Sequence, residues 1–196
     1  CTMPDQSFLP GFEAAPRPTD RLFFAIYPDA TTAAQIAALA QQLRTQHGLQ
    51  GRPLKPERFH ITLHHLGDYA GLPQDLVAAA SMAGASVAAA PFDVTFDRAA
   101  SFTSTPRNRP FVLRGDGGLA ALVAFQQSLG EALKKTVLGR WAKPGFTPHV
   151  TLLYDDRSVP EQAVPPVAWT AHEFVLVHSL IGQTLHVPLA RWPLKG

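Results

Sequence analysis

Cysteine is almost absent from this chain of 196 residues, since Cys1 is its single thiol. One thiol cannot form an intramolecular disulfide, and it excludes a zinc site built from several cysteines. The same scarcity is typical of a reducing compartment. We therefore expect a cytoplasmic protein.

The sequence also lacks an apolar run long enough to span a bilayer, so no membrane partner is expected. The first twenty residues have neither the basic start nor the continuous apolar block of a secretory signal peptide. They contain several prolines instead, namely Pro4, Pro10, Pro16 and Pro18. We expect residues 1–20 to form an irregular arm and residues 21–196 to form a single domain.

Charged residues are scarce at 16% of the chain, whereas apolar residues make up 46%. This balance excludes a wholly disordered chain, and the length suffices for a core without disulfide or metal staples. The formal net charge is only +2 and the pI is about 8.9. A protein that coats nucleic acid by charge alone is more basic, so we expect a polyanionic ligand to bind at a local site. We also expect the protein to be a monomer.

Short apolar runs alternate with helical periodicities along the chain. The runs predict strands, and apolar side chains three and four residues apart predict helices. The predicted strands cover residues 22–27, 58–66, 92–102, 111–114 and 149–154, and a hairpin is expected over 169–188 around Gly182. The predicted helices cover residues 31–46, 74–90 and 119–138. Asp29 or Thr31 is expected to cap the first helix, and Gly48 to end it.

A strand, a helix and a His-x-Thr strand occur twice in the same order. Phe23 precedes His60 by 60 − 23 = 37 residues, and Val112 precedes His149 by 149 − 112 = 37 residues, so the offset between copies is 149 − 60 = 89. Shifting the first predicted helix by 89 places it inside the third. We expect an α+β fold of two lobes, residues 21–105 and 106–196, about an approximate twofold axis and a central cleft.

The repeated tripeptides place a histidine and a threonine on the same face of each strand. Alternate side chains share a face, so His60 lies beside Thr62 and His149 beside Thr151. If both faces line one cleft, one imidazole can take a proton from an attacking oxygen while the other gives a proton to a leaving oxygen. The unperturbed pKa of histidine, about 6.5, allows both roles near neutral pH. The hydroxyls can donate to phosphate oxygens, so the chemistry requires no metal and no other cofactor.

A single strand histidine is more often structural than catalytic, and only the repetition favours a catalytic pair. His64 would share the face of His60 in a regular strand and His65 would lie on the other, so His64 is expected at the cleft rim. Four residues of a strand span roughly 13 Å, too far for His60 and His64 to hold one metal ion. The remaining histidines, His47, His172, His178 and His186, show no pattern and are expected to be structural.

Two segments carry a family resemblance, namely Arg58-Phe59-His60-Ile61-Thr62-Leu63 and Thr147-Pro148-His149-Val150-Thr151-Leu152. They resemble the paired motifs of the 2H phosphoesterase superfamily and, within it, of the RNA 2′,3′-cyclic phosphodiesterases, also called 2′-5′ RNA ligases. Residues 22–26 and 109–113 resemble the opening strands of the two halves. The resemblance covers about residues 20–185.

The resemblance implies a bilobal fold with the site in the central cleft. It implies hydrolysis of 2′,3′-cyclic phosphates, on RNA ends or small cyclic nucleotides, to 2′-phosphates. It also implies reversible, ATP-independent joining of RNA ends through a 2′-5′ bond. By position, His60 would be the acid for the leaving 3′-oxygen and His149 the base for water.

The sequence departs from the family pattern at two positions. His65 stands where the family usually has a phenylalanine, and Tyr154 where it often has an arginine. Both rings can stack on a base, so both are candidate substrate-binding residues. The missing guanidinium removes a bidentate phosphate clamp. Two alternatives therefore stay open: a module that binds a nucleotide or RNA end without turnover, and a phosphodiesterase for another small cyclic phosphate, such as ADP-ribose 1″,2″-cyclic phosphate.

Overall fold

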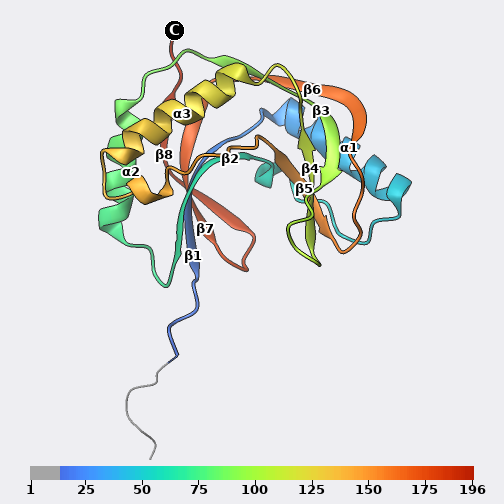
Figure 1. Ribbon diagram of the computed structural model, residues 1–196, viewed down its shortest axis with the longest axis horizontal. Coiled ribbons are helices and arrows are strands. Elements are labelled where there is room, and N and C mark those ends of the chain that lie inside the picture. Colours follow the sequence, from blue (N-terminus) through green and yellow to red (C-terminus); the bar gives the residue numbers. More distant parts are fainter. Residues whose placement is uncertain (1–13) are drawn as a thin grey trace, which may run out of the picture.

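The computed structural model describes residues 14–196, and residues 1–13 of the expected arm lie outside this range. Two four-stranded antiparallel sheets stand side by side, with helices on their outer faces (Figure 1). The first sheet has the order β2 (Ile61–Tyr69), β1 (Asp20–Ile26), β7 (Glu173–Leu180) and β8 (Leu185–Pro193). The second has the order β5 (Val150–Asp155), β4 (Arg109–Arg114), β3 (Phe92–Ser101) and β6 (Gln162–Ala171).

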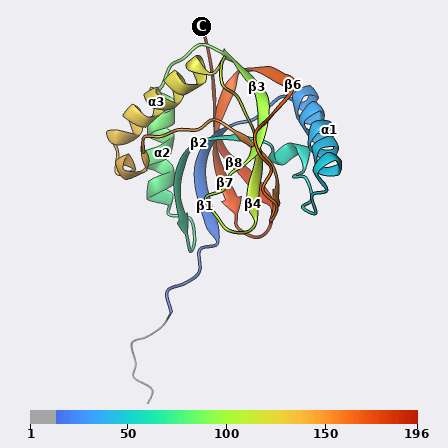
Figure 2. The ribbon, with the colours of Figure 1, turned by 45° about the vertical axis from the view of Figure 1, so that its right-hand side comes forward.

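Two of the helices are exchanged between the sheets, since each packs on the sheet that lacks the strand preceding it. Helix α1 (Ala30–His47) follows β1 of the first sheet but packs on β5 and β6 of the second. Helix α3 (Ala120–Lys134) follows β4 but packs with α2 (Gln74–Ser86) over the first sheet (Figure 2). The expected α+β class is confirmed. The sheets do not coincide with the sequence halves 21–105 and 106–196, because the first sheet combines strands from both.

Most predicted elements form close to their expected positions, and β6 is the main element that the sequence analysis missed. Pro165 and Pro166 lie inside it, and proline cannot donate to a sheet ladder. Strand β6 tolerates them because it is an edge strand with an irregular register: Val167 lies opposite Phe96, whereas Ala163 lies opposite Arg98. The expected hairpin over 169–188 accordingly starts later, at β7.

Helix α1 shows why the local prediction succeeded. The Asp29 side chain accepts a hydrogen bond from the Thr32 amide at 2.7 Å, and Gly48 ends the helix in the left-handed conformation with φ of 62°. The side chains at the predicted apolar positions are buried: Ile36, Leu39, Ala40 and Leu43. The helix therefore binds its sheet through the face that the periodicity indicated.

Each motif strand carries a β-bulge directly after its threonine. In β2, Thr62 lies opposite Ala25 and His64 opposite Phe24, so one residue of β2 is extra. In β5, the corresponding pairs are Thr151 with Val112 and Leu153 with Phe111. A bulge inverts the alternation of side chains beyond it. Residues 65 and 154 therefore turn to the same face as the two motifs.

The bulge overturns the expected orientation of His64 and His65. His64 is only 5% exposed and packs on the helix side of the sheet, where its Nε2 bonds the Gln126 carbonyl at 2.8 Å. His65 lies opposite Phe23, which belongs to a small buried cluster on the inner face of the first sheet. The expectation of a rim position for His64 was wrong because it assumed a regular strand.

Asp155 fixes the segment that leads from α1 to the first motif. Its carboxylate accepts hydrogen bonds from the amides of Gln50 at 2.6 Å, Gly51 at 2.8 Å and Arg157 at 2.8 Å. Burial opposes its charge, but the three amides lower the pKa of the carboxyl below its usual value. Because Asp155 ends β5, the chain segment that leads from α1 to His60 is docked on the strand that follows His149.

We expect Asp155→Ala to lower the free energy of unfolding by about 2–3 kcal/mol, because buried amides lose a charged acceptor. Urea denaturation measures this difference. Asp75→Ala, at an exposed aspartate of α2, is the matched control and should stay within about 0.5 kcal/mol of the parent. Equal losses for the two variants would contradict the anchoring role of Asp155.

Candidate functional site

His60 is held by two hydrogen bonds at the start of β2. Its Nδ1 bonds the Arg58 carbonyl at 2.7 Å, and its Nε2 lies 3.1 Å from the Thr62 hydroxyl. Because a carbonyl only accepts, Nδ1 carries the proton of the neutral ring. Nε2 is then the basic nitrogen, and the Thr62 hydroxyl donates to it.

His149 repeats this geometry at the start of β5. Its Nδ1 donates to the Thr147 carbonyl at 2.7 Å, again two residues upstream, so its Nε2 is also the basic nitrogen. The edge of its ring meets Phe102 with centroids 4.8 Å apart. Thr151 follows on the strand, partly buried like Thr62, and no bond joins its hydroxyl to an imidazole within residues 14–196.

Three further rings surround His60, and no sequence pattern predicted that they would. Phe23 stacks on His60 at 5.2 Å between centroids, and His186 meets it edge-on at 5.0 Å. Tyr27 lies at 5.9 Å from His60, and its hydroxyl is 3.2 Å from Nδ1 of His186. His186 reaches the site from β8, far along the chain and outside any motif, so no sequence signal linked it to His60.

Burial keeps both motif histidines neutral. Desolvation lowers the pKa of His60 to about 4, against the opposing effect of the Arg58 carbonyl, and charge on His149 and Arg58 lowers it further. Desolvation also lowers the pKa of His149, with a contribution from the charge of Arg114. The charge of His149 therefore acts on His60 across the space between the two sheets.

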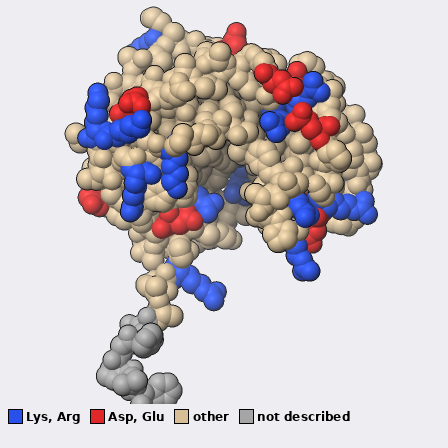
Figure 3. All heavy atoms as spheres, viewed as in Figure 1, with Lys and Arg blue, Asp and Glu red and all other residues tan. Residues whose placement is uncertain are grey.

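The two motifs belong to sheets that flank one cleft. The space-filling view shows a deep hollow between the lobes, with atoms of Lys or Arg inside it (Figure 3). The charge of Arg58 acts on His60, Tyr27 and His186, and that of Arg114 acts on His149. The structure therefore combines two imidazoles with positive charge, an arrangement suited to an anionic ligand.

His65 and Tyr154 are the exposed members of the predicted set. The His65 side chain is 42% exposed and meets Trp141 edge-on at 5.3 Å, and Tyr154 is 44% exposed opposite Pro110 of β4. Arg21 interacts electrostatically with both rings. His65 and Tyr154 lie at corresponding positions, directly beyond the bulges of β2 and β5.

Within residues 14–196, no group of three or more His, Cys, Asp or Glu side chains is arranged to hold a metal ion. His60 and His64 point to opposite faces of the sheet and cannot share one. None of the helices in this range is both long and apolar enough to cross a bilayer.

Comparison with known proteins identifies the family. Residues 28–181 match the model of the 2′-5′ RNA ligase superfamily. A crystal structure of a phosphoesterase is similar, with 26% identity, a TM-score of 0.68, and coverage of 90% of this chain and 99% of that one. E. coli LigT in its apo form has 25% identity and a TM-score of 0.67, and its complex with 3′-AMP has 28% and 0.64. Each comparison covers 92% of this chain and 100% of the LigT chain.

No curated protein matched the chain significantly. The family match nevertheless spans well over half of the sequence, and it contains both His-x-Thr motifs. The chain therefore belongs to the 2′-5′ RNA ligase superfamily of 2H phosphoesterases.

Proposed function

We propose that this protein hydrolyses 2′,3′-cyclic phosphates, on RNA ends or small nucleotides, to 2′-phosphates. The repeated imidazole geometry is the observation that carries the proposal. His60 and His149 each donate from Nδ1 to a backbone carbonyl, which leaves Nε2 of both rings available for proton transfer. One phosphorus between the rings would meet a base on one side and an acid on the other.

In the proposed reaction, a water oxygen attacks phosphorus and gives its proton to Nε2 of His149. The bond between phosphorus and the 3′-oxygen breaks, and that oxygen takes a proton from Nε2 of His60. The products are a 2′-phosphate and a free 3′-hydroxyl. The Thr151 hydroxyl would donate to a non-bridging oxygen, where negative charge accumulates. The Thr62 hydroxyl would do the same once Nε2 of His60 is protonated and no longer accepts its hydrogen bond.

The bound substrate has to favour the protonated form of the His60 imidazole. Desolvation lowers the pKa of this imidazole to about 4, so the fold alone disfavours the acid form at neutral pH. A bound phosphate anion has the opposite effect, because a nearby negative charge favours imidazolium. In the free protein the neutral form of the His60 imidazole is favoured, and the bound phosphate favours the protonated form that the reaction needs.

A nucleotide substrate agrees with the surroundings of the motifs. E. coli LigT, which this chain resembles, was crystallised with 3′-AMP. The exposed rings of His65 and Tyr154 offer stacking surfaces for a base. We propose that the protein acts in the cytoplasm, in keeping with its low cysteine content, and that it acts as a monomer.

A binding module is the competing proposal, because Tyr154 stands where many relatives carry a phosphate-binding arginine. Calorimetry with a nucleoside monophosphate beside the hydrolysis assay separates the two. Binding without turnover would favour the module. A panel that includes ADP-ribose 1″,2″-cyclic phosphate would reveal a preference for another cyclic phosphate.

We expect His60→Ala and His149→Ala each to lower turnover of adenosine 2′,3′-cyclic phosphate by about 10²–10⁴-fold, because each removes a proton-transfer group. Chromatography of adenosine 2′-phosphate formed in the presence of EDTA measures the rate. His47→Ala, on the outer helix α1, is the control and should retain activity. Unchanged rates in both motif variants would refute the paired mechanism.

We also expect kcat/KM to peak below pH 6.5, since the pKa of His60 is about 4 and that of His149 is lowered from 6.5. Above the higher pKa both imidazoles are neutral, so no acid remains and kcat/KM falls. Below the lower pKa both imidazoles are protonated, so no base remains and kcat/KM falls again. The bound phosphate should move the optimum of kcat toward higher pH. Steady-state kinetics across pH give both profiles, and a kcat/KM that still rises above pH 7 would be inconsistent with these pKa values.

A further inference from the structure

Two imidazoles from opposite edges of the first sheet meet over Phe23. His60 directly precedes the edge strand β2, and His186 lies on β8 at the other edge. Phe23, on β1, stacks on His60 at 5.2 Å between centroids and meets His186 edge-on at 5.4 Å. The two imidazoles contact each other at 5.0 Å, with their planes at 81°. His186 is therefore a direct neighbour of His60, although it belongs to no motif.

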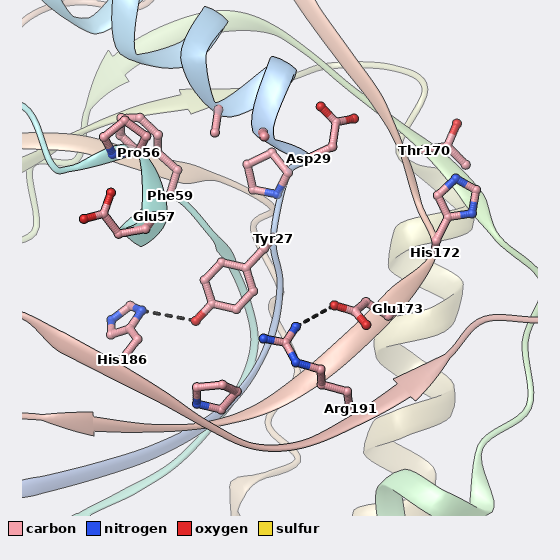
Figure 4. A pocket seen from close by; sticks show the side chains of 14 residues that line it. Tyr27, Asp29, Pro56, Glu57, Phe59, Thr170, His172, Glu173, His186 and Arg191 are labelled. Atoms are coloured by element: carbon pink, nitrogen blue, oxygen red, sulfur yellow. Dashed lines mark hydrogen bonds and ion pairs between the residues drawn. The ribbon is translucent and has the colours of Figure 1, made fainter.

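Tyr27 determines which nitrogen of His186 carries the proton. The Tyr27 hydroxyl lies 3.2 Å from Nδ1 of His186, and the two side chains point toward one another (Figure 4). Burial raises the pKa of Tyr27 to about 12, so the phenol keeps its proton. Because an imidazole nitrogen is more basic than a phenol oxygen, the hydroxyl donates to Nδ1. Nε2 of His186 then carries the proton of the neutral ring.

The surroundings of His186 favour this neutral form. Desolvation lowers the pKa of His186 to about 4, with contributions from the charges of His60 and Arg58. The proposed reaction needs a protonated His60, and a second imidazolium beside the first is disfavoured by like charge. His186 therefore offers an N–H donor that adds no positive charge next to His60.

No hydrogen bond joins Nε2 of His186 to a protein group within residues 14–196, whereas its Nδ1 has Tyr27 as a partner. His186 also lines a cavity of about 680 Å³ between β8 and the start of α1, so a ligand has access to its ring. An N–H beside His60 that lacks a protein partner is suited to an oxygen of an anion bound there. Such a donor has a particular use in this chain, because Tyr154 stands where many relatives carry a phosphate-binding arginine.

We propose that His186 is a substrate-binding residue, which donates from Nε2 to a non-bridging oxygen of the phosphate held by His60. This inference rests on the proposed function and deepens it, because it assigns a third imidazole to the same phosphate. Tyr27 acts through His186 and is a positioning residue. A neutral donor binds phosphate more weakly than a guanidinium, but it does not oppose the protonation of His60.

Nitrogen-15 NMR of protein labelled at histidine tests the tautomer in the absence of substrate. At neutral pH we expect His186 to carry its proton on Nε2, whereas His60 and His149 carry theirs on Nδ1. Tyr27→Phe should remove the preference of His186 for this tautomer and leave His149 unchanged. A proton fixed on Nδ1 of His186 in the parent protein would overturn the proposed donor.

Two substitutions of His186 separate the donor from the packing of the ring. His186→Leu keeps an apolar side chain without a donor. His186→Gln keeps both functions, since its amide oxygen accepts from Tyr27 and its amide nitrogen donates. We expect His186→Leu to lower kcat/KM for adenosine 2′,3′-cyclic phosphate about tenfold, and His186→Gln to stay within about threefold of the parent. The loss should appear mainly in KM, because the donor contacts the phosphate in both the bound substrate and the transition state.

His172→Leu is the matched control, because His172 is an exposed histidine that lines the same cavity. We expect this variant to keep the parent values of kcat and KM. Urea denaturation of all the variants shows whether a loss of activity comes from a loss of stability. Equal losses in His186→Leu and His186→Gln, with unchanged stability, would assign the effect to the ring and overturn the donor.

Calorimetry with 3′-AMP measures the same contact without turnover. We expect His186→Leu to weaken the affinity about tenfold, and His172→Leu to leave it unchanged. Hydrolysis with parent KM and parent affinity in His186→Leu overturns the role of His186 and leaves the hydrolase intact. Binding of 3′-AMP that His186→Leu weakens, in a protein without turnover, overturns the hydrolase and supports the donor. A protein that neither binds 3′-AMP nor hydrolyses the cyclic phosphate overturns both proposals.

Discussion

The docking of one chain segment on one strand connects the two motifs. The carboxylate of Asp155 binds the amides of Gln50 and Gly51, and the Leu54 amide donates to the Leu152 carbonyl at 2.8 Å. The segment that leads into His60 is thereby attached to the strand that begins beside His149. The proposed hydrolysis requires both imidazoles at once, so this attachment is a condition for their joint action. Space is tight here too, since a Cβ on Gly51 would clash with the carbonyl oxygen of Tyr154.

The sequence predicted the parts of this protein that depend on local chemistry. The caps and apolar face of α1 follow from nearby residues, and the two motifs were recognisable because their residue types repeat at one offset. The bulges at residues 63 and 152 were not predictable in this way, because they become visible only in the pairing with β1 and β4. Because of the bulge at residue 63, His65 shares a face with His60, whereas His64 does not. The exchange of helices and the approach of His186 likewise depend on contacts between distant segments.

The surroundings of the two histidines are less symmetrical than the motifs. His60 is enclosed by Phe23, Tyr27 and His186, whereas His149 has Phe102 as its aromatic neighbour. Thr62 bonds its own histidine, and the described structure gives Thr151 no such bond. A pseudo-twofold scaffold has thus placed two similar imidazoles in different environments. Different environments shift the pKa values of two identical side chains apart, which allows one to act as an acid and the other as a base.

The exchange of helices also constrains how the cleft can move. Because α1 leaves the first sheet to cover the second, and α3 does the reverse, the chain passes repeatedly from one lobe to the other. A hinge requires few connections between two rigid bodies, and this topology provides many. Neither lobe has a complete hydrophobic core of its own. We therefore expect the width of the cleft between the motifs to be set by the folded core, so that a ligand enters an opening formed before it binds.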